Sequence, residues 1–281
     1  MLFVDTHSHL NSEAYQHDCD EVMERSLAGR VWMINIGTDK ESSELAVRLA
    51  SGRKEGVFAA VALHPENVGQ EKFDPGFYRN LARSSKKVVA VGETGLDYAF
   101  FAPDIVSGSQ KRATRPSADA AGLPIEDGHK NLQKEIFKKH IELAVELDKP
   151  LIIHCRKAHD DILDILVSCS MLHVSGLRGV AHSFLGNYKQ ARRYRELGFK
   201  IAFNGIITYA RDYDKVIMDT PISDILIETD CPYLTPVPYR GERNEPTYVL
   251  EVAKKLAEIK GISLEDVARQ TTENAREVFG I

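Results

Sequence analysis

Residues 131–155 read NLQKEIFKKHIELAVELDKPLIIHC and join an amphipathic segment to a short apolar run. From Leu132 to Leu147, apolar residues recur at the three- and four-residue spacing of a helix. Pro150 helps to end this helix, and an almost wholly apolar strand follows it. Such strands are typical of a parallel sheet that is buried on both faces. The stretch therefore predicts a helix over Asn131–Leu147 and a strand over Leu151–Cys155.

The same alternation of apolar runs and amphipathic segments extends along the whole chain. Near the C-terminus we predict two further helices, Thr247–Lys260 and Ser263–Thr271, and Ser263 with Asp266 resembles the start of a capping box. The eight predicted strands are Leu2–His7, Val31–Gly37, Val57–Leu63, Val88–Gly92, Leu151–Cys155, Gly179–Ser183, Lys200–Phe203 and Ile225–Glu228.

Eight strands that alternate with helices indicate the α/β class and a (β/α)8 TIM barrel with extra C-terminal helices. The length of 281 residues suits this fold, because such a barrel needs ~250 residues. We therefore expect a single domain over residues 1–281. A doubly wound open sheet is the alternative, but it usually has fewer strands and favours a glycine-rich turn after the first strand, which this sequence lacks.

The composition is that of a soluble globular protein, with 43% hydrophobic and 27% charged residues. A net charge of -5 excludes a protein that binds nucleic acid through an overall positive charge. A local cationic patch or bound metal ions could still bind the phosphates of a nucleic acid. The four cysteines lie far apart in the sequence, which is typical of reduced thiols in a cytosolic protein. We expect a cytoplasmic protein with no secretory signal, no membrane association and no evident obligate protein partner.

Polar residues gather where the predicted strands end. His7 and His9 are two residues apart on extended chain, so their side chains point the same way, although two such histidines could equally face solvent. The C-terminal ends of barrel strands converge on one mouth, where active sites of this fold lie. Residues of the metal-binding type end six of the predicted strands: His7 and His9, His64, Glu93, His154, His182, and Asp230.

Imidazole and carboxylate groups together suit Zn²⁺, Mn²⁺ or Fe, and the carboxylates could also serve Mg²⁺. The set of His7, His9, His154, His182, Glu93 and Asp230 is larger than one catalytic metal needs. Two divalent metals roughly 3.5–4 Å apart would use it fully if they shared a carboxylate. Glu93 is the natural bridge, because its strand lies between the strands that carry the two histidine groups. Asp230 could bind a metal and accept a proton from the attacking water, so we predict Glu93 and Asp230 as the catalytic residues.

Four further residues are considered for substrate binding, and His64, Arg156 and Arg240 are the predicted contacts. His64 could donate to a phosphate oxygen or a leaving group, or it could orient a metal ligand. Arg156 lies two residues after His154, so it is expected to face the same cleft and grip phosphate, with an ion pair to the next helix as the alternative. Arg240 and Arg243 follow the last strand, where barrels often bind phosphate, and one of the two could instead pair with a nearby glutamate.

The remaining histidines are predicted to be surface or loop residues without a role: His17, His129, His140, His159 and His173. Tyr98–His129 lacks clear periodicity and is predicted to be a long loop insertion on the catalytic face. It carries Lys111, Arg112 and Arg115. Our hypothesis is that it borders the cleft and contacts the nucleic-acid backbone; the alternative is a passive surface insertion.

Seven motifs, in order from residue 5 to residue 246, resemble the TatD family of metal-dependent deoxyribonucleases. Two of them, Gly92–Tyr98 and Glu228–Tyr233, are specific, whereas His-x-His alone is weak. The motifs are His7-x-His9, Leu63-His64-Pro65, Gly92-Glu93-Thr94-Gly95-Leu96-Asp97-Tyr98, Ile153-His154-Cys155-Arg156, His182-Ser183-Phe184, Glu228-Thr229-Asp230-Cys231-Pro232-Tyr233 and Arg240-Gly241-Glu242-Arg243-Asn244-Glu245-Pro246.

The resemblance implies an amidohydrolase-like barrel with two metal sites that share Glu93. It implies hydrolysis of DNA phosphodiester bonds, often as a 3′-5′ exonuclease, with single-stranded DNA or 3′ ends as the partner. The implied ligands of one metal are His7, His9, Glu93 and Asp230, and those of the other are Glu93, His154 and His182.

The alternative function is that of a metal-dependent deacylase or amidohydrolase that cleaves an ester such as D-aminoacyl-tRNA, because the family is also linked to that reaction. Many amidohydrolases bridge their metals with a carboxylated lysine, so the carboxylate of Glu93 favours the nuclease. Arg156 and Arg240 favour it too, since they suit a phosphate-bearing substrate. A non-catalytic binding protein on a hydrolase scaffold is the third alternative, and the intact ligand set argues against it.

Overall fold

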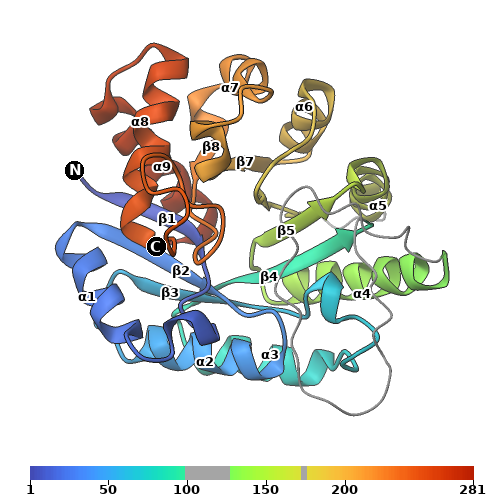
Figure 1. Cartoon of the computed structure of the whole chain (residues 1–281). Helices are drawn as coiled ribbons and strands as arrows, with labels where there is room; N and C mark the ends of the chain where they lie inside the picture. The colour runs from blue at the N-terminus through green and yellow to red at the C-terminus, as the bar shows by residue number, and fades with distance from the viewer. Residues whose placement is uncertain (99–126, 172–175) are drawn as a thin grey trace.

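The computed structural model describes residues 1–98, 127–171 and 176–281. Within these residues, eight strands form one parallel sheet in sequential order, so the TIM-barrel prediction is confirmed. Figure 1 shows the strands at the centre of the molecule and the helices around them. The strands are β1 (Phe3–Ser8), β2 (Val31–Ile36), β3 (Val57–Val61), β4 (Val88–Asp97), β5 (Leu151–Arg156), β6 (Gly179–Ala181), β7 (Phe199–Phe203) and β8 (Ile225–Ile227).

Each strand is followed by helical segments that cover the outside of the barrel. The α-helices of the described residues are α1 (Cys19–Ala28), α2 (Lys40–Ser51), α3 (Pro75–Ser84), α4 (Asp127–Glu146), α5 (His159–Met171), α6 (Tyr188–Glu196), α7 (Asp214–Asp219), α8 (Val249–Lys260) and α9 (Leu264–Phe279). Short 3-10 segments are η1 (Glu13–Tyr15), η2 (Pro65–Asn67), η3 (Gly205–Thr208), η4 (Ile222–Asp224) and η5 (Pro246–Tyr248). None of the helices in the described part of the chain has the length and apolar character that a membrane crossing requires.

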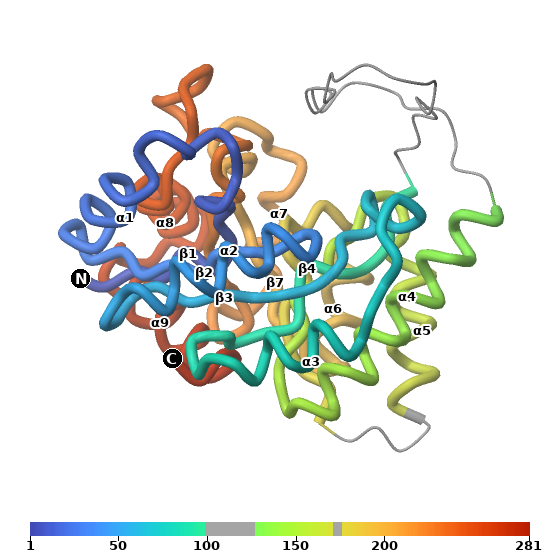
Figure 2. The backbone as a smooth tube through the Cα atoms, turned by 90° about the horizontal axis from the view of Figure 1, so that it is seen from below, coloured from blue at the N-terminus to red at the C-terminus, as the bar shows by residue number. Residues whose placement is uncertain are grey.

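Two apolar layers hold the barrel together. Side chains that face its interior, such as Val4, Ile34 and Leu226, form one buried cluster, separate from the larger cluster between strands and helices. Helix α9 contributes Val278 and Phe279 to the interior cluster, and it lies beside the N-terminal strand in Figure 2. These contacts explain why α9 continues to Phe279, past the predicted end at Thr271.

The barrel closes between β1 and the segment after β8. The backbone N–H of Asp230 donates to the carbonyl of His7 at 2.9 Å, and that of His9 donates to the carbonyl of Cys231 at 2.9 Å. Asp5 lies two residues before His7, and its carboxylate accepts hydrogen bonds from the backbone N–H and the hydroxyl of Thr229, at 2.8 and 2.6 Å. The first and last strands are therefore joined at the level of three predicted metal ligands.

The predicted loop over 98–129 is wrong at its C-terminal end, because α4 begins at Asp127 and includes His129. Residues 99–126, with Lys111, Arg112 and Arg115, lie outside the described residues.

His140 is a second correction, because it is buried in α4 instead of lying at the surface. Its Nε2 accepts a hydrogen bond from the backbone of Leu63 at 3.1 Å, and its Nδ1 lies 2.9 Å from the carbonyl of Ile136. Burial lowers the pKa of His140 to about 3, so the ring is neutral and serves packing.

Candidate metal centre

The structure brings the six predicted ligands together at the C-terminal mouth of the barrel. Their side chains come from β1, β4, β5 and the segments after β1, β6 and β8, and all six residues are at most 9% exposed. On one side, Glu93 Oε2 lies 3.2 Å from His7 Nε2 and 3.8 Å from His9 Nε2. Asp230 Oδ1 lies 3.5 Å from His9 Nε2, so these four side chains form a first cluster of donor atoms.

The other oxygen of Glu93 faces a second cluster. Glu93 Oε1 lies 2.7 Å from His154 Nδ1 and 3.4 Å from His182 Nε2. His64 was predicted to lie outside both ligand sets, but its Nε2 is as close to Glu93 Oε1 as that of His182, at 3.3 Å. Glu93 thus has one oxygen in each cluster, which is the geometry expected of a carboxylate that bridges two metals.

A local irregularity of β4 places Glu93 in this position. The strand was predicted to end at Gly92, but it continues to Asp97. Gly92 is in register with Ile152 of β5 and Thr94 with Ile153, so Glu93 is an extra residue that forms a bulge, a feature that re-aims side chains next to active sites. Gly95 keeps the two strands close beyond the bulge: its φ is 147°, and a Cβ there would lie 2.0 Å from the carbonyl oxygen of His154.

Three of the imidazoles have a polar partner on the side away from Glu93 or Asp230. His154 Nε2 lies 3.0 Å from Asp97 Oδ2, His182 Nδ1 lies 2.9 Å from Glu228 Oε1, and His9 Nδ1 lies 3.3 Å from the carbonyl of Ile36. Metal-bound histidines usually have such a partner, which fixes the ring and raises its basicity. Neither Asp97 nor Glu228 was predicted to hold a histidine of the metal centre. For Glu228, the signal was its position directly after the apolar run of the eighth strand, two residues before Asp230.

The electrostatics of the centre favour cations. Burial acts to raise the pKa of Glu93, but the imidazoles of His64, His7 and His182 outweigh it and hold the pKa well below its usual range. Burial also opposes the charged form of His154, yet hydrogen bonds with Asp97 and Glu93 raise its pKa to about 10. The carboxylates of Asp97 and Glu93 therefore stabilise the protonated, positively charged ring of His154 between them.

Burial lowers the pKa of His7 to about 4 and that of His182 to about 4, so both rings are neutral at pH 7. A neutral ring offers a lone pair to a metal. In the described part of the chain, His64 Nε2 and Glu93 Oε2 are buried without a hydrogen-bond partner. Buried polar atoms seldom remain unpaired, so the donor set fits divalent metal ions of the kind that imidazole and carboxylate bind.

The three arginines considered for phosphate binding differ in their surroundings. Arg156 ends β5, and within the described residues its side chain has no ion pair, so the alternative of a pair with the next helix is not observed there. Arg240 is exposed and stacks on Tyr209, with its guanidinium carbon 3.8 Å from the ring centroid. Arg243 pairs with Asp18 at 2.5 Å and with Glu245 at 3.4 Å. Of the two arginines after the last strand, Arg243 is therefore the one that pairs with a nearby glutamate.

Replacing Asp97 with asparagine is expected to lower the metal affinity of the cluster around His154 by about 10–100-fold, because His154 loses the charged partner of its Nε2. Calorimetric titration of metal-free protein measures this change. Asp148→Asn is the matched control, since Asp148 pairs with Arg178 at the surface. Equal metal affinity in Asp97→Asn and in the control would show that Asp97 does not support the centre.

Comparison with known proteins agrees with the fold and with a metal-dependent hydrolase. The family model described as TatD related DNase matches residues 4–280. YabD of Bacillus subtilis, an uncharacterized metal-dependent hydrolase, is 35% identical, and the match covers 100% of both chains. YcfH of Escherichia coli, also an uncharacterized metal-dependent hydrolase, is 33% identical over 100% of this chain and 97% of its own. The crystal structure of YjjV, a TatD homologue from Escherichia coli, has a TM-score of 0.82 at 27% identity and covers 99% of this chain and 98% of that one.

Proposed function

Because this chain belongs to the TatD related DNase family and is a metal-dependent hydrolase, we propose that it cleaves phosphodiester bonds of DNA with two divalent metal ions, as a 3′-5′ exonuclease. The observation that carries the proposal is the position of Glu93, whose two oxygens lie in two separate clusters of donor atoms. Two-metal sites of this kind are common in enzymes that transfer or hydrolyse phosphate esters.

Each metal would have its own set of ligands. His7, His9 and Asp230 would hold the first with Glu93, and His154 and His182 would hold the second with Glu93. His64 Nε2 is a further donor on the second side, at 3.3 Å from Glu93. Bound there, the two cations would lower the pKa of a water molecule and stabilise charge on the phosphate oxygens.

The remaining chemistry falls to side chains of the mouth. Asp230 is 5% exposed and lies at the edge of the first cluster, where its carboxylate can accept a proton from the attacking water. Arg156 ends the strand that carries His154, and a guanidinium there can hold a phosphate through two parallel hydrogen bonds. Arg240 extends the positive charge to the segment after β8.

Metal-loaded protein is expected to shorten a single-stranded oligonucleotide from its 3′ end. An excess of chelator is expected to reduce the cleavage rate to the background rate measured without protein. Gel analysis of substrates labelled at the 5′ end or at the 3′ end distinguishes the two directions and separates exonuclease from endonuclease products. An oligonucleotide of the same sequence with a blocked 3′ end is the control. If D-aminoacyl-tRNA is hydrolysed and DNA is not, the substrate is an ester and the nuclease proposal is wrong.

A further inference from the structure

Exposed apolar side chains gather behind three neighbouring strands of the barrel. Of the nine large hydrophobic residues that are exposed in the described part of the chain, five follow the carboxyl ends of β6, β7 and β8: Leu185, Tyr188, Tyr209, Tyr233 and Val237. Single exposed apolar side chains are ordinary, but several together beside an active site indicate a surface that binds a partner. The hydrolysis proposed above gives none of the five a task.

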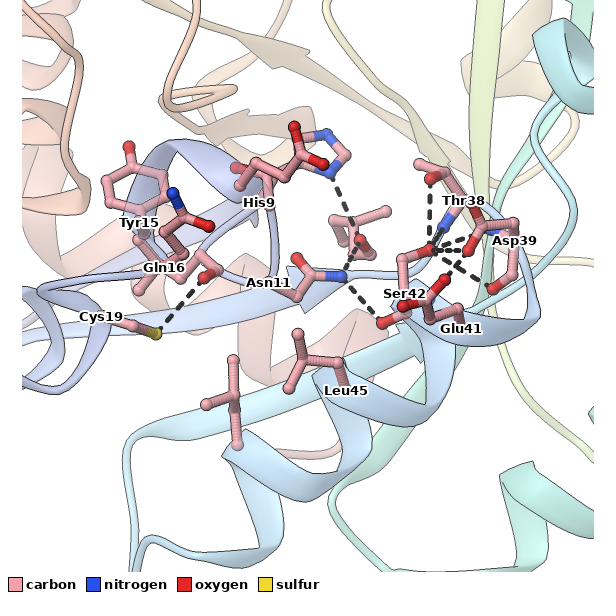
Figure 3. A pocket seen from close by; sticks show the side chains of 15 residues that line it. His9, Asn11, Tyr15, Gln16, Cys19, Thr38, Asp39, Glu41, Ser42 and Leu45 are labelled. Carbon is pink, nitrogen blue, oxygen red and sulfur yellow. Dashed lines mark hydrogen bonds between the residues drawn. The ribbon is translucent and has the colours of Figure 1, made fainter. Parts of the chain in front are cut away.

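Tyr233 lies directly beside the metal centre. Its backbone N–H donates to the carbonyl of Asp230 at 2.9 Å, and the centroid of its ring lies 6.4 Å from that of His9. The ring of His9 is itself held in place, because its Nδ1 lies 3.3 Å from the carbonyl of Ile36, a contact that the dashed line from His9 marks in Figure 3. Tyr233 is nevertheless 37% exposed. One part of this side chain therefore faces the first cluster, and another part faces solvent.

The segment after β8 packs against the segment after β7. A Cβ on Gly205 would lie 2.0 Å from the carbonyl oxygen of Leu234, so only glycine permits this approach. Further along, the backbone N–H of Val237 donates to the hydroxyl of Thr208 at 2.9 Å. Residues 205–209 and 233–240 therefore form one continuous surface, here called the mouth rim, which begins beside the metal centre and ends at Tyr209.

A cation marks the outer end of the mouth rim. The guanidinium of Arg240 stacks on Tyr209, with 3.8 Å between its carbon and the ring centroid. A guanidinium that lies flat on a ring keeps its N–H groups at its edge, where they can bind a phosphate. Arg240 is exposed, and within the described residues it has no ion pair with an acid. The mouth rim thus presents an aromatic ring beside the metal centre and an oriented cation farther from it.

We propose that the mouth rim binds the single-stranded substrate next to the metal centre: Tyr233 stacks on the base of a nucleotide beside the scissile phosphate, and Arg240 binds a phosphate farther along the strand. The inference rests on the proposed function. Every base has a flat face, so stacking holds a strand of any sequence. Contacts between arginine and phosphate are equally independent of sequence. Bases that are paired in a duplex are not available to the ring, so the mouth rim fits an unpaired strand.

The first test measures binding of a strand that resists cleavage, so it does not depend on catalysis. The probe is a fluorescent single-stranded oligonucleotide with phosphorothioate linkages at its 3′ end, and anisotropy gives its dissociation constant in the presence of Mg²⁺. Tyr233→Ala is expected to weaken binding about tenfold, and Tyr233→Phe, which keeps the ring, about twofold or less. Tyr239→Ala is the matched control, because the ring of Tyr239 is already stacked on that of Tyr248, with centroids 4.2 Å apart.

Abasic strands separate stacking from a structural effect of the substitution. A strand that lacks the base of its last or its penultimate nucleotide offers the ring no partner at that position. We expect Tyr233→Ala and the unmodified chain to bind one of these two strands with equal affinity. An equal loss on the ordinary strand and on both abasic strands would overturn the inference, because Tyr233 would then act on the site and not on a base. Unchanged binding of the ordinary strand by Tyr233→Ala would overturn it as well.

Salt dependence tests the contact of Arg240. When a protein loses one phosphate contact to a single strand, the slope of the logarithm of the binding constant against that of the salt concentration falls by about 0.7. Arg240→Gln is expected to show this decrease, whereas Tyr233→Ala keeps the slope. Arg276→Gln is the matched control, because Arg276 also lies over a ring, 5.6 Å from the centroid of Trp32, but near the amino end of β2. An unchanged slope in Arg240→Gln would contradict the phosphate contact.

Failure of the proposed function would give a different result. If binding depends on Tyr233 and Arg240 as expected but an ordinary strand is not cleaved, hydrolysis of DNA is refuted and the mouth rim remains a surface for single strands. If an ordinary strand is cleaved and Tyr233→Ala binds it as the unmodified chain does, only the present inference is refuted. The absence of any binding by the unmodified chain would refute both.

Discussion

Glu93→Gln is expected to lower the turnover number on single-stranded DNA by on the order of 10³-fold or more. Glutamine has the same shape as glutamate, so the fold should persist. It carries no charge, however, and its amide nitrogen cannot bind a cation. The amide nitrogen would replace one of the two Glu93 oxygens, either Oε2, which lies 3.2 Å from His7 Nε2, or Oε1, which lies 2.7 Å from His154 Nδ1. One of the two clusters would therefore lose the oxygen that Glu93 contributes to it. Single-turnover cleavage of a labelled oligonucleotide measures the loss.

Metal content separates this explanation from a general loss of structure. Elemental analysis of purified Glu93→Gln is expected to find at most half the metal of the unmodified chain. Glu242→Gln is the matched control, because Glu242 is an exposed acid on the segment after β8 and is not part of either cluster. If Glu93→Gln kept both its full metal content and more than a tenth of the activity, Glu93 would not be the bridge.

Asp5→Ala is expected to lower the free energy of unfolding by about 3–4 kcal/mol, because it leaves the buried N–H and hydroxyl of Thr229 without their acceptor. Asp5 is 0% exposed, and burial raises the pKa of its carboxyl well above the usual range. Its two bonds to Thr229 join the first strand to the segment after the last one, so their loss also weakens the closure of the barrel. Urea unfolding, followed by circular dichroism, measures the change.

Asp5→Asn provides the matched control. Asparagine keeps the carbonyl oxygen that accepts from the Thr229 backbone, and its NH₂ group can donate to the Thr229 hydroxyl after that hydroxyl rotates. We expect a loss of about 1 kcal/mol or less for this variant. A loss of similar size in Asp5→Asn and Asp5→Ala would mean that the negative charge, and not the hydrogen bonds, stabilises the closure.

The order of strands and helices was predictable because it follows from local patterns. The apolar runs of Leu151–Cys155 and Val57–Leu63 identify buried parallel strands, and the structure has strands at both places, with ends that differ by one or two residues. The extent of α9 was not predictable from spacing alone. Its last residues are helical because Val278 and Phe279 pack into the interior of the barrel, which is formed by strands far away in the sequence.

By itself, the sequence determined that histidines and acids end successive strands, and the barrel topology then required them to meet at one mouth. The tertiary structure alone decided how they meet. The bulge at Glu93, the approach of His64 to the second cluster and the acids behind His154 and His182 all depend on distances between segments that are remote along the chain. Periodicity reports which way a side chain points from its own backbone, but a ligand set also depends on the register between neighbouring strands, and that register is fixed only when the whole barrel closes.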